Sequence, residues 1–204
     1  MKKNKFKIMI SIFVCILILT VIIITLIYKD NKPLTVSYSQ AMWVFNASTP
    51  EMGIGISDYV FVCKVNKILR TEYKYPAETA IGIMTTPYTV YSIDVVKNIK
   101  GNLNTSKSIE FMQYGGLNED GKSYHFFEGG ALLEVGEYYV LMADTWIAED
   151  ENYEIIEVGD PRRIKSLGKD FDITTESGLE TVRKYEEAYK NEYVPSKKKR
   201  RCIR

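Results

Sequence analysis

The sequence predicts a mainly β protein, a five-stranded barrel with a C-terminal helix, preceded by one transmembrane helix. Three observations support this fold class. Residues 8–28 are apolar and uncharged, residues 57–160 hold five stretches of β-branched and aromatic residues between turn signals, and residues 178–193 carry apolar side chains at helical spacing. A chain of 204 residues, 46% of them hydrophobic, is long enough for one sizeable core.

The N-terminal apolar segment is predicted to cross a membrane. At about 1.5 Å per residue, residues 8–28 would span the roughly 30 Å hydrocarbon layer as a helix. Four lysines precede the segment and two follow it closely, so the positive-inside rule places residues 1–7 in the cytoplasm as a basic tail. A cleaved secretory signal is the alternative, but its apolar region would be shorter and followed by small residues. The expected localisation is therefore the cell membrane, single-pass, with an extracytoplasmic domain.

Residues 29–56 are predicted to form a juxtamembrane linker. A short helix could form over residues 39–46 within it. Trp43 and Phe45 in that helix suit either the aromatic belt of a membrane interface or packing under the barrel. The Gly-Ile-Gly-Ile segment at 53–56 is expected to release the chain into the first strand.

The first three strands are predicted from their β-branched and aromatic content. The first begins near residue 58 and extends to about residue 72, and a connection containing Pro, Gly and Thr follows at 75–87. In the second strand, at 88–100, successive side chains point to opposite faces, and one of these faces is largely apolar. The length of this strand suits a sheet that coils around itself. Gly101 permits a tight turn, after which residues 108–114 return as the hairpin partner.

The later strands and the helix are predicted from shorter patterns. Residues 138–143 are apolar on both faces, which favours a central, enclosed strand. Residues 153–158 form the next strand, which ends before Pro161 because proline cannot donate a ladder hydrogen bond. In residues 178–193, apolar side chains recur every three or four positions, so this helix is expected to pack on the barrel. The folded domain is therefore placed at residues 57–194.

Charge is distributed unequally along the chain. The net charge is +1 overall, but residues 33–196 contain 15 lysines and arginines against 25 acidic residues, a net charge of −10. Such a body does not suit nucleic-acid backbones, since phosphate binding depends on basic residues. The basic tail at 195–204 could contact anionic lipid headgroups or wall polymers, or could simply be a solvated end. Its candidate contact residues are Lys197, Lys198, Lys199, Arg200 and Arg201.

The three cysteines indicate neither a disulfide framework nor a metal site. Cys15 lies in the apolar segment, where it is expected to face lipid or another helix, Cys63 lies in a predicted strand, and Cys202 lies in the basic tail. Too few soft ligands remain for a structural zinc site, so no metal is expected. Cys202, beside several basic residues, could react or form a dimer.

No pattern of an active site is present. The single histidine, His125, lies between two aromatic residues and away from any recognisable nucleophile motif, so a packed or loop position is favoured over catalysis. The acidic cluster at 150–152 lacks the ligand spacing of a calcium loop. We therefore expect a protein that is not an enzyme, with no catalytic residues, no cofactor and no small-molecule substrate.

Three segments in order resemble the netrin-like OB barrel of tissue inhibitors of metalloproteinases and its bacterial relatives. They lie at 57–65, 88–101 and 133–141, within about half of the chain. The resemblance implies an OB-like barrel. The free N-terminal cysteine and the disulfides of those inhibitors have no counterpart here, so zinc-directed inhibition is not implied.

The high content of Lys, Ile, Asn and Tyr is similar to that of low-GC Gram-positive bacteria.

Three functions are compatible with these features. The first is a membrane-tethered extracytoplasmic binding module for a protein or a cell-envelope glycan, with contacts from the loop tyrosines Tyr73, Tyr75 and Tyr124. The second is a structural or assembly subunit of a membrane complex, held through the span itself. The third is a single-stranded nucleic-acid-binding OB domain, which would need a basic groove and is opposed by the acidic body.

Overall fold

The chain divides into two units, residues 1–35 and residues 36–204. The computed structural model describes residues 16–21, 34–79, 82–147 and 154–195. In the first unit, residues 16–21 are helical and exposed. Among the described residues, no helix is both long enough and apolar enough to cross a membrane. Most of the span predicted at 8–28 lies outside the described residues.

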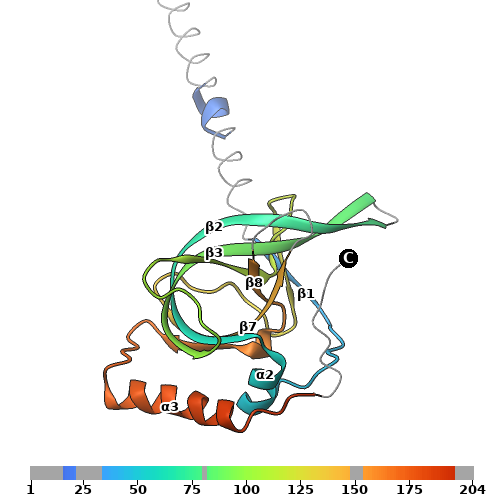
Figure 1. The fold of residues 1–204 in the computed structure, drawn as a ribbon. Helices are drawn as coiled ribbons and strands as arrows, with labels where there is room; N and C mark the ends of the chain where they lie inside the picture. The colour runs from blue at the N-terminus through green and yellow to red at the C-terminus, as the bar shows by residue number, and fades with distance from the viewer. Residues whose placement is uncertain (1–15, 22–33, 80–81, 148–153, 196–204) are drawn as a thin grey trace, which may run out of the picture. The chain divides into compact units, whose positions relative to one another are not determined.

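Five strands of the second unit close into a barrel (Figure 1). Around the barrel, their order is β2 (Tyr59–Thr79), β3 (Gly82–Lys100), β4 (Ile109–Tyr114), β8 (Glu154–Val158) and β7 (Tyr138–Ile147). The first half of β7 pairs back with β2 and completes the circle. The pairings are antiparallel except for β4 with β8, which run parallel. The predicted mainly β fold with a five-stranded barrel is confirmed.

The barrel interior is filled by one face of each strand. On β3, the predicted apolar face is confirmed because Tyr91, Ile93 and Val95 are all buried in the core. The Tyr91 hydroxyl donates a hydrogen bond to Gln113 Oε1 at 2.9 Å and accepts one from the Leu133 N–H at 3.1 Å. A phenol can therefore lie inside the barrel without an unsatisfied polar group.

Strands β2 and β3 continue beyond the barrel as a two-stranded ribbon, which we call the arm (Figure 1). Its pairing reaches Thr79 opposite Gly82, so the irregular connection predicted at 75–87 is wrong. A bulge at Tyr75, whose φ is +54°, accommodates Pro76. Proline is tolerated here because each strand of a two-stranded ribbon is an edge strand.

The predicted linker contains regular structure. Strand β1 (Thr35–Ser39) forms a three-stranded sheet with β6 (Ser123–Phe127) and β5 (Gly116–Leu117). The helix predicted over residues 39–46 is wrong, since the chain there has bends but no helical turn. A helix begins later, at α2 (Pro50–Ile56).

The glycine-containing segment at 53–56 lies inside α2 and does not act as a release point. Thr49 caps the helix through its side chain, which accepts a hydrogen bond from the Met52 N–H, and Pro50 occupies the first turn. Such N-terminal signals can start a helix even where two glycines lower its propensity. Its buried residue Ile54 packs in a cluster that also holds Val62 of β2.

The predicted C-terminal helix is confirmed as α3 (Glu176–Lys190), two residues earlier than expected at its start. Thr175 caps it by accepting a hydrogen bond from the Gly178 N–H at 3.1 Å. Val182 and Tyr185 are buried against the outside of β2 and β7. Before it lie a 3-10 turn, η1 (Pro161–Arg163), and a further strand, β9 (Ile164–Gly168), which pairs with β7.

Candidate binding surface

Five aromatic side chains from five parts of the fold form a continuous row, which we call the aromatic row. Successive ring centres are 5.0, 3.8, 5.6 and 6.1 Å apart, and the second pair is stacked within 7° of parallel. Edge-to-face and stacked pairs of this kind stabilise one another beyond the area that they bury. In order, the members of the row are Trp43, Phe127, Tyr114, Tyr88 and Tyr75.

The row is most buried at Tyr88 and most exposed at its arm end. Tyr88 is buried in an apolar cluster with Val90, Met112 and Ile155, separate from the barrel core. Tyr75, at the arm end, is 50% exposed, and the other three rings are partly buried. Because the row is anchored at Tyr88 and through its ring contacts, its partly exposed rings are held in place for a ligand.

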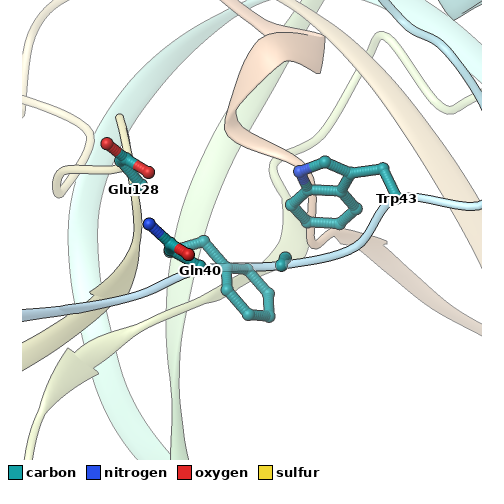
Figure 2. A pocket seen from close by; sticks show the side chains of 5 residues that line it. Gln40, Trp43 and Glu128 are labelled. Carbon is teal, nitrogen blue, oxygen red and sulfur yellow. The ribbon is translucent and has the colours of Figure 1, made fainter.

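At the other end, the row borders a hollow of about 310 Å³, which we call the Trp43 hollow. Its size lies at the lower end of the range for small-molecule sites. Figure 2 shows Gln40 and Glu128 on one side of it and Trp43 on the other. The lining residues are Gln40, Ala41, Trp43, Phe127 and Glu128.

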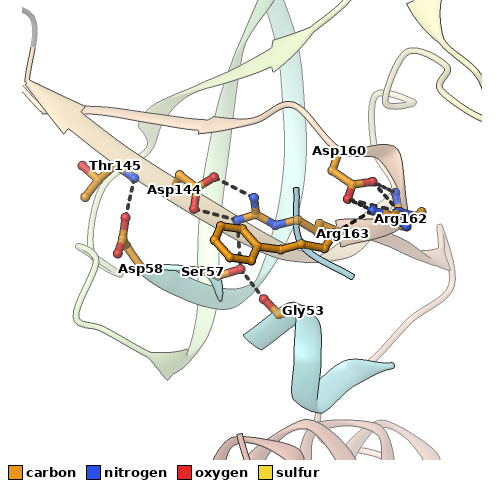
Figure 3. A network of polar contacts seen from close by, with 9 residues as sticks. Gly53, Ser57, Asp58, Asp144, Thr145, Asp160, Arg162 and Arg163 are labelled. Atoms are coloured by element: carbon orange, nitrogen blue, oxygen red, sulfur yellow. Dashed lines mark hydrogen bonds and ion pairs between the residues drawn. The ribbon is translucent and has the colours of Figure 1, made fainter. Parts of the chain in front are cut away.

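Arg162 of η1 fixes the position of Trp43. Its guanidinium lies 5.5 Å from the centre of the Trp43 ring, a cation–π distance, and its Nη2 donates to the Phe45 carbonyl at 3.3 Å. Asp160 accepts from Arg162 Nε and, at 2.7 Å, from Nη2 (Figure 3). These hydrogen bonds raise the pKa of Arg162. The irregular segment that carries Trp43 is thus tied to the barrel.

A second polar network joins η1 to strand β7 and to the end of α2 (Figure 3). Arg163 donates to both carboxylate oxygens of Asp144, at 2.6 and 3.0 Å, and to Ser57 Oγ at 2.9 Å. Ser57 in turn donates to the Gly53 carbonyl in α2 at 2.6 Å. Both terminal nitrogens of the guanidinium have partners, whereas the buried Arg163 Nε has none.

A smaller hollow of about 150 Å³ lies over the apolar cluster around Val90. Arg70 donates to Glu72 and to Glu110, both at 2.8 Å, and these bonds raise its pKa. Glu154 adds a third carboxylate to the lining. With three carboxylates to one guanidinium, this hollow would repel a phosphate group.

The structure brings only one of the predicted contact tyrosines into the aromatic row. Tyr75 is its arm end, and Tyr73 is a partly exposed neighbour on the same strand. Tyr124 lies on β6, partly buried and stacked on Phe126 at 6.1 Å. The basic residues at 197–201 lie outside the described residues.

His125 joins β6 to β1. Its Nδ1 lies 3.0 Å from Ser37 Oγ and its Nε2 lies 3.1 Å from Ser39 Oγ, and its ring contacts Tyr114 edge-on. Burial lowers the pKa of this imidazole. Because a hydroxyl can donate or accept, both ring nitrogens have a partner in the neutral form, as expected for a packed residue.

The described residues contain neither a metal-binding cluster nor an exposed cysteine. Among the described residues, no cluster of three or more His, Cys, Asp or Glu side chains could hold a metal ion. Cys63 is a free thiol, fully buried, and burial raises its pKa. A buried neutral thiol is unreactive.

The sequence did not identify most of the aromatic row as one site, because strand pairings and the Arg162 contact bring its members together. The members that were missed are Trp43, Tyr88, Tyr114 and Phe127. A local signal did exist, since β3 carries two tyrosines and β4 contains Phe111 and Tyr114, all in the half of the hairpin away from its turn. The chain matches no protein-family model and no curated protein. Its function is therefore inferred from the surface described above.

Proposed function

We propose that this protein is a membrane-tethered, extracytoplasmic binding module and that its ligand occupies the Trp43 hollow. The observation that carries the proposal is the row of fixed aromatic rings ending in a hollow with two polar side chains. Aromatic side chains supply large contact area at low entropic cost, and they dominate the energetics of many binding sites. Trp43 is the central residue of this site.

The strand order supports an OB-type barrel. Strands β2, β3, β4, β8 and β7 form a closed circle in which only β4 and β8 run parallel, as in OB domains. OB domains bind ligands on the face of their second and third strands, which here are β3 and β4. Tyr88 and Tyr114 of the aromatic row belong to these two strands. The aromatic row, which borders the Trp43 hollow, therefore includes residues of the strands that commonly hold ligands in this architecture.

The tether is supported by the uncharged segment at 8–28 and by the lysines before it. A binding role is favoured over catalysis because Arg162, the cationic group beside Trp43, is already paired with Asp160. Nucleic acid is disfavoured as the ligand, since Glu128 lines one hollow and three carboxylates line the other.

A second candidate function, an assembly subunit, is favoured by the arm. Ile83 and Met84 are 69% and 54% exposed near its tip. Both strands of the arm also have edges that can accept a further strand. A protein partner could therefore bind the arm by strand addition or by covering its apolar side chains.

Trp43→Ala is expected to reduce ligand capture by about tenfold or more, because a central aromatic contact is typically worth about 2 kcal/mol or more. The full-length protein, solubilised and immobilised, would be incubated with a solubilised cell-envelope fraction, and retained material would be quantified. Tyr189→Ala, on α3, is the control and is expected to retain normal capture. Normal capture by Trp43→Ala together with loss in Ile83→Asp would favour the assembly function instead.

A further inference from the structure

We infer that the ligand class of the Trp43 hollow is a neutral saccharide. This inference rests on the binding function proposed above and names what that site recognises. It follows from three properties of the hollow: fixed aromatic walls, a donor and acceptor pair on the opposite side, and an acidic environment that disfavours anions, with Arg162 already beside the ring that a cation would use.

The aromatic walls are held in place before any ligand arrives. Phe127 is stacked on Tyr114 with ring centres 3.8 Å apart, and Trp43 meets Phe127 at 79°. Arg162 also contacts the Trp43 ring, with its guanidinium 5.5 Å from the ring centre. Sugar rings have apolar C–H faces that pack on aromatic rings, and fixed rings avoid the entropic cost of ordering on binding.

The polar groups of the hollow match hydroxyl groups. The Gln40 amide can both donate and accept hydrogen bonds, whereas the ionised Glu128 carboxylate accepts only. A sugar presents neighbouring hydroxyls, each of which donates and accepts, so both side chains would find partners on one ligand. Gln40 and Glu128 are exposed and lie on the same side of the hollow (Figure 2).

Charge selects against anionic ligands, and the position of Arg162 makes a cation a poor fit. An anion would meet Glu128 in the hollow and, beyond it, a body of net charge −10 over residues 33–196. The same charges attract a cation, but the Arg162 guanidinium already lies 5.5 Å from the centre of the Trp43 ring, whose π-face a cation would use. A neutral, hydroxyl-rich ligand meets neither obstacle.

The test is direct titration of the full-length protein in a polyoxyethylene detergent, which presents neither a sugar nor a quaternary ammonium headgroup. The probes are maltotriose, cellotriose and tri-N-acetylchitotriose, which are all neutral, with choline chloride and trilysine as cationic competitors. We expect at least one trisaccharide to bind and neither cation to bind. Trp43→Ala is expected to weaken that binding at least tenfold, Trp43→Phe to retain part of it, and Tyr189→Ala to leave it unchanged.

The outcomes separate this inference from the proposed function. Failure of all three trisaccharides, or equal binding by wild type and Trp43→Ala, would overturn the saccharide inference. If choline or trilysine binds and Glu128→Gln abolishes that binding, the ligand is a cation, so the inference is wrong while the hollow remains a binding site. If envelope capture is also indifferent to Trp43→Ala, the proposed function fails as well. Thermal unfolding of each variant shows whether the fold is intact.

Discussion

Arg163→Met is expected to lower the free energy of unfolding by about 2–3 kcal/mol. Its side chain is almost fully buried and holds Asp144 and Ser57 together through three hydrogen bonds. Removing one partner of a fully buried ion pair costs about 3–5 kcal/mol. Asp144 is 37% exposed and can be hydrated after the change, so the expected cost is smaller. For a domain of this size, the melting temperature should fall by about 5–10 °C.

Lys169→Met is the matched control for this prediction. Lys169 is paired with Glu134 at 3.2 Å, but both side chains are more than half exposed, and such surface pairs contribute little. Calorimetry or thermal unfolding of both variants would give the comparison. Equal stability of Arg163→Met and Lys169→Met would show that the network around Ser57 does not hold α2 and η1 to the barrel.

Gly55→Ala is expected to destabilise the protein by about 1–2 kcal/mol, although alanine is the better helix former by about 1 kcal/mol. A Cβ at this position in α2 would overlap the backbone carbonyl oxygen of Tyr193. The chain after α3 is held on α2 at this point, because the Tyr193 N–H donates to the Glu51 carbonyl at 3.2 Å. Overpacking against backbone typically costs about 1–3 kcal/mol, since neither segment can move alone.

Gly53→Ala provides the comparison within the same helix. Its Cβ would meet the Met142 sulfur at 2.7 Å, and a methionine side chain can shift to make room. We therefore expect Gly53→Ala to be close to neutral in thermal unfolding. If Gly55→Ala proved as stable as Gly53→Ala or more so, the packing of the C-terminal segment on α2 would be refuted.

The sequence predicted the parts of the fold that local periodicity determines. Strand β4, the start of β7 and helix α3 agree with their predicted ranges to within three residues, because alternation and helical spacing are properties of neighbouring residues. The buried face of β3 followed from the same alternation. The barrel was also predictable, since a strand as long as β3 suits a coiled sheet.

The parts that were missed depend on distant contacts. The arm was hidden by Pro76 and Pro87, which usually interrupt strands but are tolerated in a two-stranded ribbon. Strand β1 is stabilised by pairing with β6 and by the serine contacts to His125. The Trp43 hollow likewise combines a loop with β6, more than 80 residues apart in the chain. No local pattern carries such information.

The most direct test of the binding site is photocrosslinking in intact cells. A benzophenone amino acid placed at position 41 would lie in the Trp43 hollow, and the same group at position 190 would lie on α3. Irradiation should yield an adduct with an envelope component from position 41 and none from position 190. Trp43→Ala in the same chain should abolish that adduct. Adducts from position 190 alone, or an adduct from position 41 that survives Trp43→Ala, would contradict the assignment of the hollow as the binding site.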